Sequence, residues 1–163
     1  HATIRRQRQM CIRDRDVSHD DYPRKLAWFD SLLTYLQAQH RPDVPHIIGG
    51  DFNVCPTALD SWHGEAAAGG IFHTEAERQR IHGILDWGVR DLFRVQFPDE
   101  QVFSWWDYRG GAFHKKQGLR IDFLLGTAPT VERLSSIGTD RDYRKKQNGL
   151  TASDHAPVIA ELA

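Results

Sequence analysis

Residues 46–53 read HIIGGDFN, and this stretch decides the fold that the sequence predicts. The segment 46–49 follows two prolines that end the preceding helix, and its apolar residues predict a short buried strand. That strand leads directly into Asp51 and Asn53, which carry oxygen-bearing side chains. Because a sheet fixes the geometry of side chains at its strand ends, we expect chemistry at this point.

Helices and further strands flank this segment in the sequence. An amphipathic helix is predicted from Asp20 to His40, because Leu and Phe recur there at three- and four-residue spacing, and Asp21 is the expected cap. Residues 74–77 (TEAE) indicate a capping box that opens a second helix, which ends at Gly88. Further expected elements are a helical turn within 89–97 and strands at 102–106, 119–125, near Ile137 and at 158–162. This mixture predicts an α+β fold, with one mixed, mostly antiparallel sheet and helices on one face.

The composition narrows the class of protein. A length of 163 residues suits one domain with a real core, and 40% hydrophobic with 26% charged residues excludes disordered and membrane classes. No apolar run approaches the roughly 18 residues that span a bilayer, so a cytoplasmic location is expected. Cys11 and Cys55 show neither CxxC nor zinc-site spacing. The sequence therefore predicts neither a disulfide framework nor a structural zinc site.

Basic residues gather in two predicted loops, although the net charge of −1 is not typical of a nucleic-acid-binding domain. The first cluster contains Arg109, His114, Lys115, Lys116 and Arg120, and the second contains Arg141, Arg144, Lys145 and Lys146. Each cluster is either a solvated surface or a surface for nucleic-acid phosphates.

Five polar residues lie at or beside predicted strand ends, where several strands can direct side chains to one point: Asp51, Asn53, Asp122, Asp154 and His155. Singly, each has a simpler explanation, because an Asp at a strand end is often a turn or capping residue. Together they fall in three motifs that follow one another along the chain: GDFN at 50–53, LRIDF at 119–123 and SDHAP at 153–157. The joint pattern favours one shared site.

These motifs, with FSWWDYR at 103–109, resemble the C-terminal half of the exonuclease III and AP endonuclease family, within the endonuclease/exonuclease/phosphatase superfamily. The similarity covers about 20–162. It implies that the chain forms half of a four-layer αββα sandwich. It also implies an exodeoxyribonuclease III-like hydrolase of DNA repair, with 3′–5′ exodeoxyribonuclease and abasic-site endonuclease activity.

The resemblance also implies a role for each site residue. Asp51 would activate or orient the attacking water or protonate the leaving oxygen, and Asn53 would hold a phosphate oxygen or a metal-bound water. His155 would donate a hydrogen bond to the scissile phosphate, while Asp122 accepts one from the other ring nitrogen. The implied metal site comprises Asp51, Asn53, Asp154 and His155. Hard oxygen ligands suit Mg²⁺, with Mn²⁺ as a substitute.

DNA contacts are implied in the same way. Trp105 would line a pocket for a base-less sugar or stack on a base, and Tyr108 and Arg109 would meet backbone phosphates. The remaining implied contacts are Lys115, Lys116 and Arg120. The implied partner is double-stranded DNA with abasic sites or 3′ ends, and the full-length protein would be a monomer.

The sequence departs from the family pattern near its beginning. Residues 1–16 include a basic stretch without hydrophobic periodicity, which we expect to lie outside a domain formed by 17–163. The family's metal-binding Glu and catalytic Tyr belong to the N-terminal half, so the chain is expected to be a fragment that is poorly stable and inactive alone. Apolar residues of the strands near 48, 105, 123 and 159 would then be uncovered.

Two other functions stay open at this point. The same catalytic centre could act on another phosphodiester or phosphomonoester, such as RNA, a phosphoinositide or sphingomyelin. A non-catalytic nucleic-acid-binding relative is the third hypothesis. The presence of Asp51, Asn53, Asp122 and His155 argues against it, because binding alone has no chemical need for all four.

Overall fold

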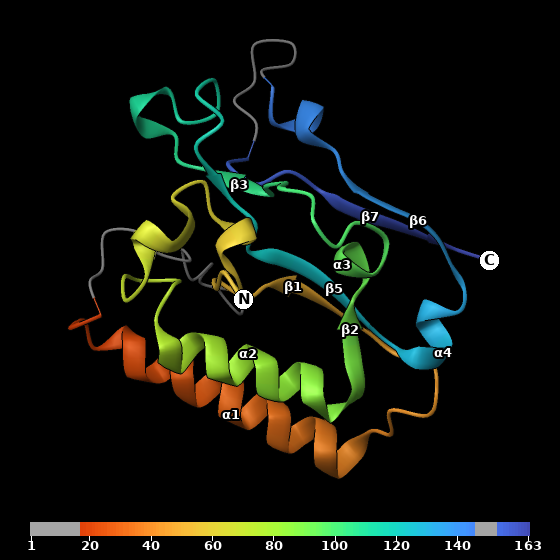
Figure 1. Cartoon of the computed structure of the whole chain (residues 1–163). Coiled ribbons are helices and arrows are strands. Elements are labelled where there is room, and N and C mark those ends of the chain that lie inside the picture. Colours follow the sequence, from red (N-terminus) through yellow and green to blue (C-terminus); the bar gives the residue numbers. More distant parts are fainter. Residues whose placement is uncertain (1–16, 146–152) are drawn as a thin grey trace, which may run out of the picture.

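A computed structural model describes residues 17–145 and 153–163 (Figure 1). The stretch 1–16, expected to lie outside the domain, is outside the described residues. The α-helices are α1 (Asp21–Gln39), α2 (Glu75–Gly88), α3 (Leu92–Gln96) and α4 (Ala128–Val131). The strands are β1 (Ile47–Asp51), β2 (Val89–Asp91), β3 (Trp105–Trp106), β4 (Gly118–Leu119), β5 (Asp122–Thr127), β6 (Leu134–Thr139) and β7 (Val158–Leu162). Short 3₁₀ helices are η2 (Ala58–Asp60), η3 (Gly64–Ala67), η4 (Arg109–Gly111) and η5 (Arg141–Arg144).

Both long helices form where the hydrophobic spacing predicts them. In α2 the capping box is confirmed, because Thr74 Oγ1 accepts a hydrogen bond from the Glu77 backbone N–H at 3.2 Å and the Glu77 side chain accepts one from the Thr74 N–H at 2.9 Å. The predicted cap of α1 is wrong by one residue. Asp20 holds the cap position, and Asp21 is the first helical residue, whose carboxylate bonds Arg24 at 3.1 Å.

The strands form three separate antiparallel sheets within the described residues, so the expectation of one mixed sheet is wrong. Strand β5 pairs with β1 on one side and β2 on the other, β3 pairs with β4, and β6 pairs with β7. The expected strand 119–125 is interrupted for a physical reason. The N–H of Arg120 donates to the Asp60 carbonyl at 2.8 Å and that of Ile121 donates to Ser104 Oγ at 3.1 Å, so neither joins a ladder.

The segment 89–97 is also only partly as expected. A helical turn forms at its end as α3, but its first residues form β2 against β5. Asp91 separates the two, because its side chain accepts hydrogen bonds from the N–H groups of Phe93 at 3.0 Å and Arg94 at 3.4 Å. A short polar side chain at this position caps the helix and ends the strand.

The main core lies between the three-stranded sheet and the helix pair. Figure 1 shows α1 and α2 side by side on one face of β1 and β5. Side chains alternate along β5, so Phe123 and Leu125 pack against Phe29 and Ile84 of the helices, whereas Leu124 packs in a second cluster with α3 and β6. Mixed helix and antiparallel strand content confirms the α+β class.

The expected exposure of strand residues is confirmed only in part. Ile159 of β7 is 53% exposed and Ile47 of β1 is 46% exposed. Trp105 and Phe123 are buried instead, with exposures of 7% and 2%, because they face the side chains of neighbouring loops and helices. Among the helices of the described ranges, none has the length and apolar content to cross a membrane.

Candidate active site

The ends of β1 and β5 bring two carboxylates together. In the antiparallel register, Asp51, the last residue of β1, lies opposite Asp122, the first residue of β5. Directly opposed residues point to the same face of a sheet, with Cβ atoms about 5 Å apart. Two acidic side chains from distant parts of the sequence therefore share one strand end.

The imidazole of His155 completes this group. His155 forms an isolated antiparallel bridge with Trp105, and this pairing fixes its backbone beside β3. Its Nδ1 lies 2.9 Å from Asp122 Oδ2 and 3.1 Å from Oδ1. Ligand atoms of Asp51, Asp122 and His155 all lie within 4.8 Å of one another. The prediction that the residues at 51, 122 and 155 meet at one point is confirmed.

The backbone of Asn53 contacts this group of three residues. Its N–H donates to Asp51 Oδ1 at 2.9 Å, and its φ of 51° places it in the left-handed region. This local turn, closed by the bond from the Asn53 N–H to the Asp51 side chain, keeps Asn53 beside the site. Its expected contact with a phosphate oxygen or a metal-bound water stays a prediction.

Asp154 has a different environment from the three grouped residues. Its Oδ2 accepts a hydrogen bond from Trp105 Nε1 at 2.8 Å, and its backbone carbonyl accepts one from the Trp106 N–H at 3.1 Å. These contacts fasten the SDHAP segment to β3. The assignment of Asp154 as a metal ligand stays a prediction.

Burial and neighbouring charges shift the pKa of Asp51. Partial burial raises the pKa of the Asp51 carboxyl above its ordinary value, and the negative charge of Asp122 raises it further. The backbone N–H of Asn53 and the charge of His155 act in the opposite direction. The carboxyl remains open to solvent, so it can exchange protons. A carboxyl with a raised pKa suits a group that takes up or releases a proton during a reaction.

Sequence reasoning missed Ser104, which joins the parts of the site. Ser104 is fully buried, and its Oγ accepts hydrogen bonds from the N–H groups of Ile121 and Asp122, each at 3.1 Å. Its carbonyl accepts one from the Ala156 N–H at 2.7 Å. The backbones that carry Asp122 and His155 are therefore both attached near Ser104. A small polar residue inside the aromatic run FSWWDYR was the available signal.

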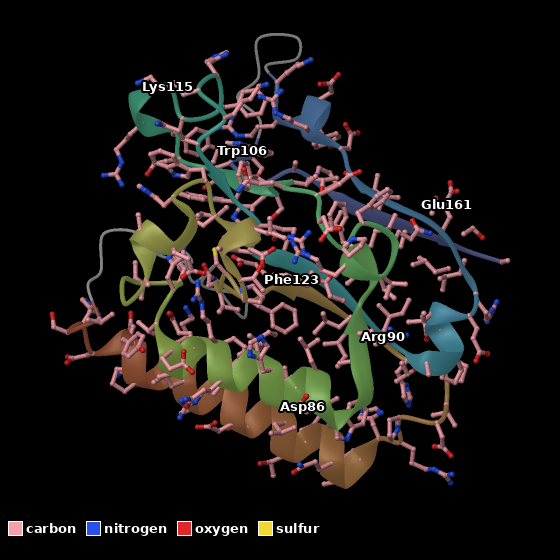
Figure 2. All side chains as sticks on the ribbon, in the orientation of Figure 1. Asp86, Arg90, Trp106, Lys115, Phe123 and Glu161 are labelled. Atoms are coloured by element: carbon pink, nitrogen blue, oxygen red, sulfur yellow. The ribbon has the colours of Figure 1, made fainter. Side chains whose placement is uncertain are left out.

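The loop between β3 and β4 exposes most of the residues predicted to meet DNA. Tyr108 is 51% exposed, and Arg109, Lys115 and Lys116 are exposed as well. Lys115 lies on this loop, at the opposite end of the molecule from α1 (Figure 2). Their contact with DNA stays a prediction that the exposure permits.

The prediction that Arg120 contacts DNA is wrong. Arg120 is only 3% exposed, and its guanidinium contacts Asp60 Oδ1 at 2.7 Å and Asp91 Oδ2 at 2.7 Å. The interruption between β4 and β5 turns this side chain inward, where the two carboxylates balance its charge. Arg120 therefore stabilises the fold and is not available to a phosphate at the surface.

The second basic cluster also has an internal role. The Arg141 guanidinium lies 4.1 Å from the ring centre of Phe113, and that of Arg144 lies 4.6 Å from the ring centre of Tyr108. Arg144 is only 9% exposed. It therefore fits neither of the two predicted alternatives, a solvated surface or a surface for nucleic-acid phosphates. These contacts attach η5 to the loop between β3 and β4. Lys146 lies outside the described residues.

Trp105 lines a hollow at the loop between β3 and β4. The hollow has a volume of about 410 Å³, and its other lining residues include Trp62, His63, Phe72 and Leu119. Its lining is largely aromatic, and the Trp105 side chain in its wall donates from Nε1 to Asp154 Oδ2. Binding of a sugar or a base in this hollow stays a prediction.

Comparisons with known proteins identify relatives of this chain. Residues 4–155 match the model of the endonuclease/exonuclease/phosphatase family. The chain is 33% identical over 148 residues to exodeoxyribonuclease III of Haemophilus influenzae, which covers 86% of this chain and 54% of that protein. It is 30% identical over 145 residues to an exodeoxyribonuclease of Bacillus subtilis, covering 88% of this chain and 54% of that protein.

A solved structure gives the same result. An AP endonuclease from Archaeoglobus fulgidus superposes with a TM-score of 0.83 at 30% identity, covering 90% of this chain and 56% of that one. The chain thus spans about half the length of the relatives it matches. With the family model matching most of its residues, this chain belongs to the endonuclease/exonuclease/phosphatase family, in the group of exodeoxyribonuclease III and the AP endonucleases.

Proposed function

We propose that this chain contributes catalytic residues to a Mg²⁺-dependent DNA repair phosphodiesterase with 3′–5′ exodeoxyribonuclease and abasic-site endonuclease activity. One observation carries the proposal: Asp51, Asp122 and His155 place two carboxylates and an imidazole within 4.8 Å at one strand end. Hydrolysis of a phosphodiester needs a group to handle protons and donors that stabilise charge on the phosphoryl oxygens, and this set can supply both.

The geometry suggests a role for each residue. Asp122 accepts from His155 Nδ1 and so directs Nε2 away from itself, towards the phosphate. When both ring nitrogens carry protons, Nε2–H donates to a phosphoryl oxygen while Nδ1–H remains bonded to Asp122. Asp51, with its raised pKa, orients the attacking water and takes its proton, or protonates the leaving oxygen. Asn53, at the rim, would donate its side-chain amide to a phosphoryl oxygen.

The donor set fits a hard divalent cation. Asp51 and Asp122 present carboxylate oxygens at one point, which Mg²⁺ prefers and Mn²⁺ accepts. We propose that Asp51, Asn53 and Asp154 hold the ion or its waters through oxygen atoms, and that His155 does so through Nε2 when that atom carries no proton. A bound cation would neutralise charge that develops on the phosphoryl oxygens.

Double-stranded DNA with abasic sites or 3′ ends is the proposed substrate. Exposed Tyr108, Arg109, Lys115 and Lys116 on one loop supply positive charge and an aromatic ring for backbone contacts. The hollow beside Trp105 supplies an aromatic-lined space of about 410 Å³ for a displaced sugar. A related structure, a 3′ phosphatase from Neisseria bound to product DNA hairpin, superposes with a TM-score of 0.84 at 29% identity, covering 94% of this chain and 59% of that one.

We also propose that residues 17–163 form the C-terminal half of a four-layer αββα domain, which is a monomer when full length and inactive when this half is alone. The matched relatives support the correspondence to about half of a domain, because the chain spans 54% of each exodeoxyribonuclease. The exposed apolar residues Ile47 and Ile159 would then pack against the other half.

The experiment uses the full-length protein that the gene encodes and a duplex with one abasic site. We expect cleavage at that site with Mg²⁺, and loss of cleavage with chelator that is restored by added Mg²⁺ or Mn²⁺. Cleavage unaffected by chelator would reject the proposed metal requirement. Absence of cleavage of both this duplex and a recessed 3′ end would reject the proposed nuclease activity.

A duplex with a 3′-phosphate is the matched second substrate, because the related Neisseria structure is that of a 3′ phosphatase. Phosphate release without cleavage of the abasic duplex would favour a phosphomonoester substrate at the same centre. DNA binding without turnover of any of these duplexes would favour the non-catalytic hypothesis.

A further inference from the structure

A buried ion pair links the two long helices behind the active site. Lys25 of α1 contacts Glu77 of α2 through Nζ and Oε1, and the two side chains are 8% and 0% exposed. Burial lowers the pKa of Lys25, with Glu77 acting to raise it. Because removing two charges from water is costly, an apolar pair would fill this space at least as well if packing were its only role.

Glu77 holds its position independently of Lys25. Its Oε2 accepts hydrogen bonds from the Thr74 N–H at 2.9 Å and the Thr74 hydroxyl at 2.8 Å, and its Oε1 accepts one from the Phe72 N–H at 3.2 Å. These bonds are part of the cap of α2. The carboxylate is therefore a fixed anchor for the ammonium group of Lys25.

The ammonium group has a second partner at the active site. Lys25 Nζ also donates to the backbone carbonyl of Asn53. Asn53 has a φ of 51°, a conformation that costs free energy in a residue other than Gly, and its N–H donates to Asp51 Oδ1. A continuous series of bonds thus runs from Glu77 through Lys25 and Asn53 to Asp51.

We propose that Lys25, anchored by Glu77, is a positioning residue that holds the turn at 51–53 and so directs the Asp51 carboxylate. Its bond to the carbonyl keeps Asn53 in the left-handed conformation, which in turn points the Asn53 N–H at Asp51. The inference rests on the proposed function, because it assigns Lys25 a role in that site without contact with the substrate.

A second ion pair between the same helices supplies a matched control. Arg80 of α2 contacts Asp30 of α1 at 3.0 Å, with exposures of 29% and 57%, and within the part of the chain that the structure describes neither residue bonds to the turn at 51–53. Arg80→Met therefore removes a bridge between α1 and α2 without altering the support of Asn53. Lys25→Met removes both the bridge and the support.

The experiment measures kcat and KM for cleavage of the abasic duplex, and backbone hydrogen exchange of the peptide covering 51–54, in the full-length protein. In Lys25→Met we expect kcat to fall by roughly 10- to 100-fold with little change in KM, and exchange to rise mainly at 51–54. Arg80→Met should keep the wild-type kcat and the wild-type exchange at 51–54.

A double variant keeps the test valid if Lys25→Met folds poorly. Adding Glu77→Gln removes the uncompensated buried carboxylate, so we expect the melting temperature to recover while kcat stays low and 51–54 still exchange fast. Wild-type kcat in the double variant, or exchange that rises equally in all peptides, would overturn the positioning role. Absence of cleavage by the wild-type protein would instead reject the proposed function, and the exchange comparison would still test the support of the turn.

Discussion

At the scale of single residues, the site depends on how Asp122 holds His155. The carboxylate accepts from Nδ1 at 2.9 Å, which leaves Nε2 as the ring atom that can face a substrate. An imidazole without such a partner can rotate and can carry its proton on either nitrogen. Asp122 therefore determines both the orientation of the ring and the nitrogen that holds the proton.

We expect Asp122→Asn to lower kcat on the abasic duplex by roughly 10- to 100-fold, because the amide keeps the shape but loses the negative charge and offers a donor to Nδ1. Steady-state kinetics of the full-length protein measure the effect. Asp86→Asn, the same change at an exposed position of α2, is the control and should leave kcat unchanged (Figure 2). Equal kcat values in the two variants would contradict the role of Asp122.

Ser104→Ala should lower the free energy of unfolding by about 1–3 kcal/mol, since it leaves the N–H groups of Ile121 and Asp122 without their buried acceptor. Urea denaturation measures the loss. Ser136→Ala is the control, because Ser136 makes an exposed hydrogen bond to Glu161 and its removal should cost much less. Similar losses in both variants would show that Ser104 is not the link between the strands.

At the scale of secondary-structure elements, the junction between α2 and β2 depends on one glycine. Gly88 has a φ of 131°, and a Cβ atom there would lie 2.5 Å from Pro42 Cβ. The segment after α1 therefore packs directly on the turn that ends α2. Gly83, inside α2, is the opposite case, because an added Cβ would lie 3.6 Å from Leu33 Cδ2, an ordinary contact distance.

Alanine at these two positions should change stability in opposite directions. Gly88→Ala is expected to lower the free energy of unfolding by about 1–3 kcal/mol through backbone strain and the clash with Pro42. Gly83→Ala is expected to raise it by up to about 1 kcal/mol through helix propensity. Thermal or urea denaturation of both variants measures the difference. A stable Gly88→Ala variant would mean that the turn can rearrange.

At the scale of the whole molecule, a buried network centred on Asp60 connects distant segments. Asp60 is fully buried, and its side chain accepts hydrogen bonds from Arg94 and Arg120 at 2.7 Å and from the Thr57 N–H at 2.9 Å. Burial, the largest influence, acts to raise the pKa of Asp60, but the positive charges of Arg120 and Arg94 and the hydrogen bonds together lower it.

A lowered folded-state pKa gives a definite sign for the pH dependence. Asp60 stabilises the fold above the pKa of an unfolded Asp, about 3.9, and this contribution is lost as the pH falls through the lower folded-state pKa. Asp60→Asn should therefore lower the free energy of unfolding by about 3–5 kcal/mol at neutral pH, because the buried Arg120 and the partly buried Arg94 each lose a carboxylate partner, and by less in acid.

Urea denaturation at neutral and acidic pH measures this difference. Asp142→Asn is the matched control, because Asp142 pairs with Lys145 at the surface, with exposures of 74% and 55%, and its removal should leave the free energy of unfolding nearly unchanged at both pH values. A cost for Asp60→Asn that does not depend on pH would contradict the electrostatic explanation.

The sequence by itself determined what short-range patterns can encode. Hydrophobic spacing and the box at Thr74 and Glu77 predicted α1 and α2, because helical contacts lie three or four residues apart. The motifs around Asp51, Asp122 and His155 indicated one site, because each lies at the end of a short predicted strand. These predictions needed no knowledge of how distant segments pack.

Only the tertiary structure decided which distant groups meet. The basic cluster predicts that Arg120 lies at the surface and contacts DNA. Its charge is instead balanced by Asp60, 60 residues away in the sequence. The pairing of Lys25 with Glu77 spans 52 residues and left no local pattern. The physical reason is that burial and charge pairing depend on the register and packing of whole elements, which no short window of sequence contains.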